Sequence, residues 1–571
     1  ENFMNDIRRT ILWVIFGFSM VLLWDQWQVH NGNKATFFPT PAQQAKVAAD
    51  ASSAVPQAAG VPTPVAPQAA VTVPAVETRA ATKELVQVET DLFKLSFDTE
   101  GGTLARVELL KHEDEQKPGH KIVLLDDSKD RIYTAQTGLI SSVPGVALPT
   151  HKSVMTVRPG ARKLKDGDNE LSITFESTAQ SGVKLVKTYT VKRGAYDMAV
   201  KHDIVNMGAQ DVAPQLYFQL VRDGNKPAGE SSFYSTFTGP AIYTEAKKYQ
   251  KVEFADIKKK KVDVEKQSST GYIAMVQHYF ASAWVLPDGM NRDISIDAVD
   301  IGSTMPDCCY RVTLIAPLDA IKPGQTKSVA ATLYAGPQEE KKLEALYPGL
   351  ELVKDYGWLT ILAKPLFWLL HQLNNILGNW GWSIVSLVVL LKAAFYWLNA
   401  HAYQSMAKMK AINPKIMEMR ERLKDNPQQM QMEMMKIYRD EKVNPMGGCL
   451  PIALQIPVFI ALYWVLLSTV EIRNAPWVGW IHDLSAPDPY FILPLFMTLT
   501  TLLQTALNPA PPDPMQAKMM WIMPLAFSVM FFFFPAGLVL YWITNNVLSI
   551  AQQWLINIRM GVPPQFNLPK F

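Results

Sequence analysis

Hydrophobic positions divide the 571-residue chain into two unlike parts. Residues 30–355 are polar and charged, whereas long uncharged runs dominate from residue 356 onward. The mean hydropathy of +0.02 is only the average of these two parts. Because the second part is too apolar for the core of a soluble domain, the pattern predicts a polar domain joined to a membrane region.

The second part contains enough apolar sequence for five membrane-spanning helices, each of which needs about 20 residues. The uncharged runs cover 381–400, 443–470, 489–512 and, on either side of a turn at Pro535-Ala536-Gly537, 519–558. The first run is interrupted only by Lys392. Residues 380–560 are therefore expected to form a core of five transmembrane helices.

An apolar run near the N-terminus predicts a sixth span. Fifteen uncharged residues, 10–24, follow the pair Arg8-Arg9 and end in a region with two tryptophans. No small-residue cleavage site follows the run, so the pattern favours a retained signal anchor over 1–28 rather than a cleaved signal peptide. Residues 29–84 are rich in proline and alanine and are expected to form a periplasmic tether.

Basic residues predict the orientation of the chain. With the N-terminus in the cytoplasm, segment 401–446 is cytoplasmic and carries nine Lys or Arg residues, whereas segment 471–489 is periplasmic and carries only Arg473. This distribution satisfies the positive-inside rule. We therefore expect a multi-pass protein with both termini, including the tail 561–571, in the cytoplasm and the large polar domain in the periplasm.

The polar domain, residues 85–350, shows the alternation typical of β-strands. Apolar residues alternate over 170–177, a turn follows at Gly182, and the alternation returns over 183–191, which predicts a β-hairpin. Many short strands of this kind predict a large β-sandwich. The run Lys258–Lys261 is expected to be a solvated loop or, alternatively, a site that attracts anionic headgroups or a partner.

An amphipathic helix over 351–379 is expected to connect the two parts. The apolar stripe of this helix consists of Leu366, Leu369, Leu370, Leu373 and Leu377. Polar residues occupy other positions of the same segment, and such a helix is suited to lying in the membrane interface.

The cytoplasmic segment 401–446 is predicted to be a helical hairpin. Apolar residues recur every three or four positions on both sides of Asn426-Pro427, and nine methionines lie between Met406 and Met446. Methionines at this spacing close a seam between two helices, and they also suit a surface that accepts many apolar partners. The four methionines expected to contact such partners are Met409, Met419, Met430 and Met434.

Lys392 is a charged residue inside an apolar run. Either its long stem lets the ammonium reach the interface, or the side chain faces a hydrated interior. The other spans carry Gln455, Gln504 and Asn545, and polar side chains of membrane helices normally face a bundle interior or a cavity. This combination favours a hydrated pocket, although the amides alone also serve as contacts between helices.

Residue types that support catalysis form no recognised pattern. The three cysteines, including the adjacent Cys308 and Cys309, have no zinc-site spacing, and no HExxH, GxSxG or Walker sequence occurs. No nucleic-acid-binding motif is present either. We therefore expect no enzymatic activity, no catalytic residue, no metal, no cofactor and no recognition of nucleic-acid sequence.

The chain resembles the YidC/Oxa1/Alb3 family of membrane protein insertases. The segments that carry the resemblance are MAKMKAINPKIMEMRERLKDNPQQMQMEMMKIYRDEKVNPMGGCLPIALQIPVFIALYW, EIRNAPWVGWIHDLSAPDPYFILP, DPMQAKMM and FPAGLVLYWITNN. With the N-terminal anchor and the large periplasmic domain, the resemblance extends over the whole chain and is to the Gram-negative bacterial members.

The resemblance implies an insertase and chaperone of the inner membrane that works without ATP hydrolysis. In the family, the five core helices form a hydrated groove open to the cytoplasm and the lipid, where a positive charge attracts acidic client segments. Lys392 stands where the family usually has arginine, so the charge is kept and the planar guanidinium is lost. The expected polar and aromatic lining of the groove is Gln455, Gln504, Tyr541, Trp542 and Asn545.

The expected partners are nascent membrane protein clients, the Sec translocon, the lipid bilayer and, through the loops 401–446 and 508–520, the ribosome and signal-recognition targeting factors. The apolar segment of a client is expected to leave along Phe459, Tyr463 and Phe531. Two other interpretations stay open. One is a secondary transporter with Lys392 as a substrate or proton site. The other is a scaffold whose β domain docks on other membrane proteins.

Overall fold

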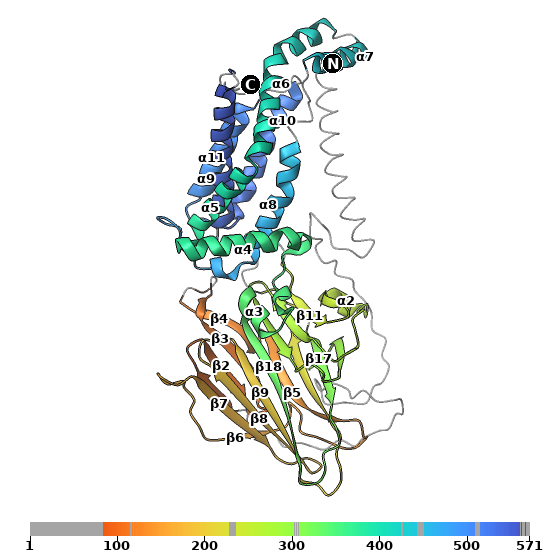
Figure 1. The fold of residues 1–571 in the computed structure, drawn as a ribbon. Coiled ribbons are helices and arrows are strands. Elements are labelled where there is room, and N and C mark those ends of the chain that lie inside the picture. The colour runs from red at the N-terminus through yellow and green to blue at the C-terminus, as the bar shows by residue number, and fades with distance from the viewer. Residues whose placement is uncertain are drawn as a thin grey trace. The chain divides into compact units, whose positions relative to one another are not determined.

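The protein is described here from a computed structural model (Figure 1). The described residues are 84–559, without 115–116, 118, 228–235, 302, 304, 306–307, 424–425, 442–449 and 509–513, together with Gly561 and Phe566. The predicted anchor, all but the last residue of the predicted tether, and most of the predicted tail lie outside these residues. The described chain divides into a β unit, 84–355 with 468–470, and a helical unit formed by the remaining residues.

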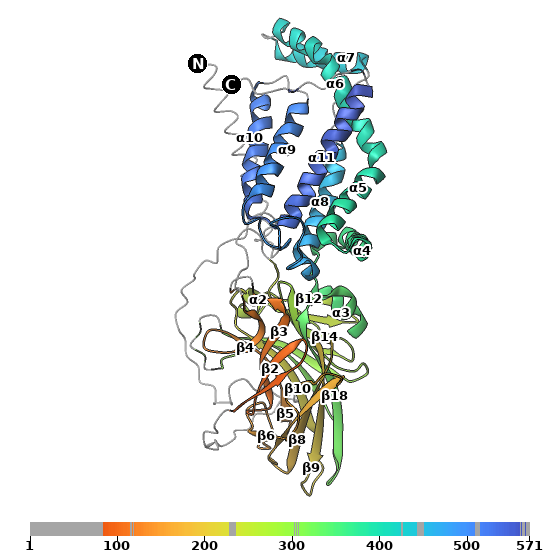
Figure 2. The same cartoon turned by 90° about the vertical axis from the view of Figure 1, so that its left-hand side faces the viewer.

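The β unit is a sandwich of two nine-stranded sheets, as the alternating pattern predicts (Figures 1 and 2). The first sheet has the order β1 (Leu85–Glu89), β2 (Phe93–Asp98), β3 (Thr103–Glu113), β4 (Lys121–Asp127), β5 (Ile132–Ser141), β10 (Pro214–Arg222), β17 (Tyr310–Pro317), β16 (Arg292–Ala298) and β13 (Gln267–Ser268). The second has the order β12 (Lys248–Lys251), β11 (Gly239–Thr244), β14 (Tyr272–Gln277), β15 (Phe280–Val285), β18 (Thr326–Pro337), β9 (Asp197–Asn206), β8 (Val183–Lys192), β7 (Glu170–Ser177) and β6 (Met155–Val157).

The predicted hairpin is confirmed in its register. β7 and β8 pair antiparallel with Ile173 opposite Tyr189, and the alternating apolar residues of both strands are buried. Because strand side chains alternate between the two faces of a sheet, these residues enter the single core that both sheets share. Three short helices complete the unit: α2 (Phe254–Lys258), α3 (Glu340–Leu346) and the 3₁₀ helix η1 (Leu350–Val353).

A buried lysine crosses the core of the sandwich. Lys187 on β8 is fully buried, and its ammonium donates to the carbonyl oxygens of Gly101 (2.7 Å) and Thr137 (2.6 Å). The Thr137 hydroxyl also lies 2.9 Å from Nε2 of the buried His202. Burial lowers the pKa of Lys187 to about 7 and is the largest cause that lowers the pKa of His202 to about 3.

The helical unit contains the second, apolar part of the chain. Its elements are η2 (Gly357–Leu359), α4 (Thr360–Leu377), α5 (Trp380–Ala394), α6 (Tyr396–Arg422), α7 (Pro427–Asp440), α8 (Leu450–Ser468), η4 (Val470–Ile472), α9 (Ile492–Leu507), α10 (Pro514–Met530), η5 (Phe531–Phe533) and α11 (Ala536–Arg559). α11 packs against α5, α6 and α9 (Figure 2).

The expected first span, 381–400, is not one straight helix. It breaks between α5 and α6 at Phe395 (φ −91°, ψ 11°), and the two helices meet at a bend of 64°. Within the described residues, only this bent pair has the length and apolar composition for a membrane crossing, and no single helix does. The six predicted spans therefore stay a prediction.

The amphipathic helix is present as α4, with two apolar faces rather than one. Leu366 and Leu370 of the predicted stripe are buried, whereas Leu377 is exposed. Ile361 and Trp368, which lie on the other face, are 87% and 60% exposed. The predicted single stripe is therefore wrong in part, because one face of α4 packs against the helical unit and a second apolar face is left uncovered.

The predicted helical hairpin is present as α6 and α7, and its cytoplasmic placement stays a prediction. Its seam is built from Ile412, Ile416 and Met419, which are buried, and from Met409, Leu423, Met430, Met434, Ile437 and Tyr438 packed against them. Two ion pairs, Lys415–Glu441 and Arg422–Glu433, link the helices on the outside. The three- and four-residue spacing thus places the methionines in a helix–helix interface.

Segment 473–490 and the turn at 535–537 close one end of the helical unit. Backbone amides of Ala536 and Gly537 donate to the carbonyl oxygens of Ala486 (2.8 Å) and Leu484 (2.9 Å). Gly381 on α5 lies against the indole of Trp477, where a Cβ atom would be 2.2 Å from the ring. This close approach requires glycine at the start of α5.

Candidate functional site

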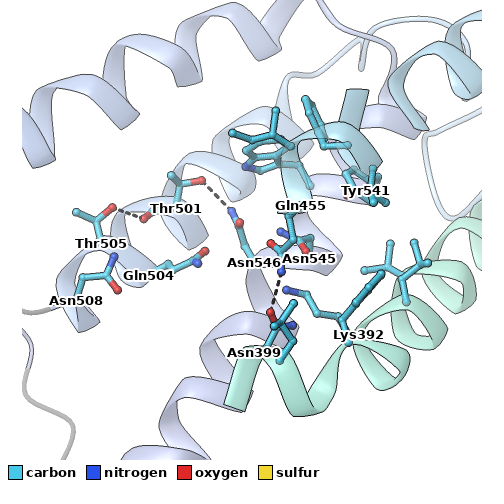
Figure 3. Close-up of a pocket in the computed structure, with 18 residues that line it drawn as sticks. Lys392, Asn399, Gln455, Thr501, Gln504, Thr505, Asn508, Tyr541, Asn545 and Asn546 are labelled. Atoms are coloured by element: carbon cyan, nitrogen blue, oxygen red, sulfur yellow. Dashed lines mark hydrogen bonds between the residues drawn. The ribbon is translucent and has the colours of Figure 1, made fainter. Parts of the chain in front are cut away.

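The helical unit contains a partly open cavity of about 340 Å³ between α5, α6, α8, α9 and α11 (Figure 3). This is many times the roughly 30 Å³ that one water molecule occupies in the liquid. Lys392 is the single charged side chain of the described lining, and no carboxylate contributes to that lining. The cavity is therefore large enough to hold water and is electrically positive.

Lys392 is held by the helix across the cavity. Its Nζ donates to the hydroxyl oxygen of Ser549 on α11 at 2.7 Å. Ser549 in turn donates to the backbone carbonyl of Asn545 at 2.7 Å, so a lone pair of the hydroxyl faces the ammonium. Among the described residues, no carboxylate lies within ion-pair distance of Lys392. The hydrogen bond fixes the position of a charge for which the described residues supply no counter-ion.

Amides and hydroxyls surround this charge. Gln455 on α8 donates to the side-chain oxygen of Asn399 on α6 at 3.0 Å, and Asn546 on α11 donates to the hydroxyl of Thr501 on α9 at 2.8 Å. Figure 3 shows Lys392 extending from α5 toward the side of the cavity where Asn399 and Gln455 lie. Each amide pair also joins two helices. These amides therefore both line the cavity and hold helices together, which are the two roles that the sequence left open.

Aromatic rings form the apolar wall. Phe459 on α8 lies 5.8 Å from Tyr541 and 4.5 Å from Trp542, measured between ring centroids. Trp542 contacts Phe531 at 5.2 Å, and Tyr463 contacts Phe534 at 6.0 Å. These rings continue the cavity wall along α8 and α11.

The structure brings most of the predicted site residues together. Those that line the cavity are Lys392, Gln455, Phe459, Gln504, Tyr541, Trp542 and Asn545. Tyr463 and Phe531 lie next to the lining rather than in it, and Phe531 is only 5% exposed. Phe531 therefore supports Trp542 from behind.

Several residues of the site were not predicted from the sequence. Asn399, Thr501, Thr505 and Asn508 line the cavity, and Ser549 binds Lys392. Asn399 gave a signal that could have been used, because it is an amide within the same run, 381–400, that contains Lys392. The threonines and Ser549 gave none, since hydroxyls in membrane helices commonly bond their own backbone.

The four methionines predicted to contact clients lie in the hairpin seam. Met419 is 3% exposed, and Met409, Met430 and Met434 pack against the seam. Contact of a client with these residues needs the hairpin to open. Among the hairpin methionines whose burial the structure describes, those exposed are instead Met417, Met432 and Met435.

The described part of the chain contains no candidate metal site, and its two adjacent cysteines are not free thiols. No group of three or more His, Cys, Asp or Glu side chains in it is placed to hold a metal ion. Cys308 and Cys309 are joined as a vicinal disulfide in the β unit.

Comparison with known proteins matches both units. The YidC periplasmic domain family matches residues 85–369, and the 60Kd inner membrane protein family matches 372–562. Among similar proteins, the membrane protein insertase YidC of Cupriavidus necator is 54% identical over 567 residues, covering 97% of this chain and 98% of that protein. The protein of the same name from Cupriavidus metallidurans is 55% identical over 559 residues, covering 97% and 98%.

A solved structure of an active YidC insertase with its first transmembrane domain resolved is also similar. It shares 18% identity and covers 83% of this chain and 92% of its own, with a TM-score of 0.37. The sequence relatives decide the assignment, since they exceed half identity over almost the entire chain. The chain belongs to the YidC family of membrane protein insertases, an inner-membrane family with a periplasmic domain.

Proposed function

We propose that this protein inserts client proteins into the inner membrane through the cavity around Lys392, whose ammonium attracts acidic client residues. The observation that carries the proposal is the charge of the cavity: one lysine, amides and hydroxyls, and no carboxylate in the described lining. An acidic client residue supplies the missing counter-charge. At 4 Å and an effective dielectric constant of 20, the attraction amounts to about 4 kcal/mol.

The cavity lowers the cost of moving a polar segment into the membrane. Backbone groups and charges lose their water when they enter hydrocarbon, which makes a complete crossing expensive. A hydrated cavity within one leaflet shortens the dry part of the path. The opposite end of the helical unit is closed by hydrogen bonds from Ala536 and Gly537 to segment 484–486. This closure supports the proposal that the cavity opens toward the cytoplasm.

Release of the client is proposed to follow the aromatic wall. Its apolar segment passes Phe459 and Tyr463, which are partly exposed, and enters lipid, where its own burial drives the step. No nucleotide hydrolysis is required, because insertion of an apolar segment is itself favourable. Phe531 keeps the wall rigid instead of touching the client, as its burial behind Trp542 indicates.

The proposed topology has six transmembrane helices, with both termini in the cytoplasm and the β unit in the periplasm. The client first meets the α6–α7 hairpin, through the exposed Met417, Met432 and Met435 and, if the hairpin opens, through its seam. The proposed partners beyond clients are the Sec translocon and, through the loops 401–446 and 508–520, the ribosome and targeting factors. Unchanged ribosome co-sedimentation after neutralising the basic residues of both loops contradicts the last assignment.

The test is insertion of a purified single-span client into liposomes that contain this protein and no Sec components. Wild type, Lys392→Arg and Lys392→Ala are compared for clients with an acidic and with a neutral N-terminal tail. We expect Lys392→Arg to insert both clients and Lys392→Ala to fail only with the acidic one. Lys322→Ala, which removes an exposed lysine of the β unit, is the matched control and should behave like wild type. Normal insertion of the acidic client by Lys392→Ala refutes the role of the charge.

A further inference from the structure

Four consecutive lysines form an exposed turn in the β unit. This lysine turn, Lys258–Lys261, ends the short helix α2. Lys260 adopts the left-handed conformation with φ 53°, and the amide of Lys261 donates to the carbonyl oxygen of Asp256 at 2.9 Å. All four side chains are exposed. The backbone geometry is that of a helix C-cap, so the bend that presents these lysines is a fixed feature of the fold.

Nearby carboxylates do not neutralise the turn. Lys247 pairs with Asp263 at 3.2 Å, and Glu265 bonds the hydroxyl of Thr244. Among the described residues, Lys259, Lys260 and Lys261 have no carboxylate within ion-pair distance. The helix dipole favours a cation in the last turn of α2, which accounts for Lys258 only. Three adjacent positive charges are thus left without a partner among the residues of the β unit that the structure describes.

Contacts within the β unit place the turn at the end of the sandwich where the chain leaves it. Lys251, seven residues before the turn, pairs with Asp355 at 2.5 Å. Asp355 is the last residue of the unit before the helical unit begins at Tyr356. Figures 1 and 2 show α2 and α3 at the same end of the sandwich. Since α4 begins at Thr360, at most about 18 Å of extended chain separates Asp355 from it.

We propose that the lysine turn binds anionic phospholipid headgroups of the periplasmic leaflet and so holds this end of the β unit at the membrane surface. The inference rests on the proposed membrane topology, because the exposed apolar face of α4 then lies in the same interface. Lysine ammoniums on flexible stems suit a layer of phosphates that has no fixed geometry. Attraction to an anionic surface acts within about one Debye length, roughly 8 Å at physiological salt.

The test uses the full chain in nanodiscs of phosphatidylcholine with a trace of a photoactivatable phosphatidylglycerol. Irradiation and peptide mapping measure the yield of lipid adducts on residues 254–266. The wild-type protein should be labelled more by the anionic probe than by a photoactivatable phosphatidylcholine. Attraction of a lysine to an anionic surface is worth about 1 kcal/mol, so Lys260→Gln with Lys261→Gln should lower the yield severalfold at low salt.

Two further variants isolate the charge. Lys260→Arg with Lys261→Arg keeps both charges and should retain the labelling. Lys152→Gln with Lys322→Gln removes two exposed lysines from other loops of the β unit and should also retain it. Equal labelling by the two lipid probes, or labelling unaffected by Lys260→Gln with Lys261→Gln, overturns the proposal and leaves an acidic protein segment as the candidate partner.

The proposal can fail independently of the proposed function. The same variants are assayed for insertion of the acidic-tailed client. Absence of adducts together with insertion that depends on Lys392 rejects lipid binding by the lysine turn and retains the insertase mechanism. If lipid adducts form but insertion is unaffected by substitution of Lys392, the insertase mechanism is rejected and the lipid site is retained.

Discussion

The buried ammonium of Lys187 should make the stability of the β unit depend on pH in the alkaline range. Its pKa is about 7 in the folded protein, against an ordinary value of 10.5. Between these values the unfolded chain holds a proton that the folded chain has released. The free energy of unfolding therefore rises as the pH rises from 7 toward 10.5, and it is flat with respect to this group below 7.

The size of the effect follows from the same two values. Linkage between pH 7 and 9.5 gives about 3 kcal/mol of added stability, at 1.36 kcal/mol per unit of pKa difference. His202 has a pKa of about 3 in the folded chain and an ordinary value of 6.5 in the unfolded chain. Because the window lies above both values, the ring is mainly neutral in both states and contributes little to the change in stability. Buried tyrosines with raised pKa, such as Tyr189 and Tyr217, lower the stability as the pH nears 10, and only the comparison with a Lys187 variant isolates the lysine.

The assay is hydrogen exchange of the full chain, with peptides of β8 and β15 as reporters of opening of the sandwich. Lys187→Met removes the titrating group and fills a similar volume, so the difference between wild type and variant isolates the lysine. The absolute stability of the Lys187→Met variant also shifts, because the carbonyls of Gly101 and Thr137 lose their hydrogen-bond donor. Equal pH slopes of the two proteins from pH 7 to 9.5 refute the reasoning.

Three further predictions concern the helical unit. Gly381→Ala forces a Cβ atom into an indole ring and should cost about 1–3 kcal/mol, seen as a lower melting temperature in detergent, whereas Gly160→Ala meets no atom within 4 Å and should not. Met419→Ser removes a buried seam residue and should speed hydrogen exchange in α7 by at least tenfold, and Met417→Ser, at an exposed position, should change it little. Ser549→Ala removes the acceptor of the cavity ammonium and should slow insertion of the acidic-tailed client by about tenfold, with rescue by Ser549→Thr and no change for a neutral tail.

Local periodicity accounts for the parts of the fold that the sequence predicted. The β7–β8 hairpin follows from strict alternation around Gly182, and the α6–α7 seam follows from methionines at helical spacing. In both cases, one face of a regular element is buried against a neighbour close in sequence. The bend at Phe395 was not predicted, because neither proline nor glycine marks it.

The cavity was predicted only as far as its residues are unusual where they stand. Lys392, Gln455 and Gln504 are conspicuous because a charge or an amide is costly in an apolar run. Ser549 and Thr501 are not, since each hydroxyl also bonds a backbone carbonyl of its own helix, and that bond satisfies it wherever the helix lies. The contact between Lys392 and Ser549 joins residues 157 positions apart, and no local pattern reports it.

The unpaired charge of the cavity also decides which feature of a client matters under the proposed mechanism. The aromatic and amide lining makes no demand for one client side chain, whereas the ammonium favours a carboxylate by about 4 kcal/mol and opposes a client Lys or Arg by a similar amount. Client segments that enter the cavity are thus selected by net charge rather than by sequence. Under this mechanism basic segments are held back on the cytoplasmic side, as the positive-inside rule describes, and acidic segments are passed because of their attraction to Lys392.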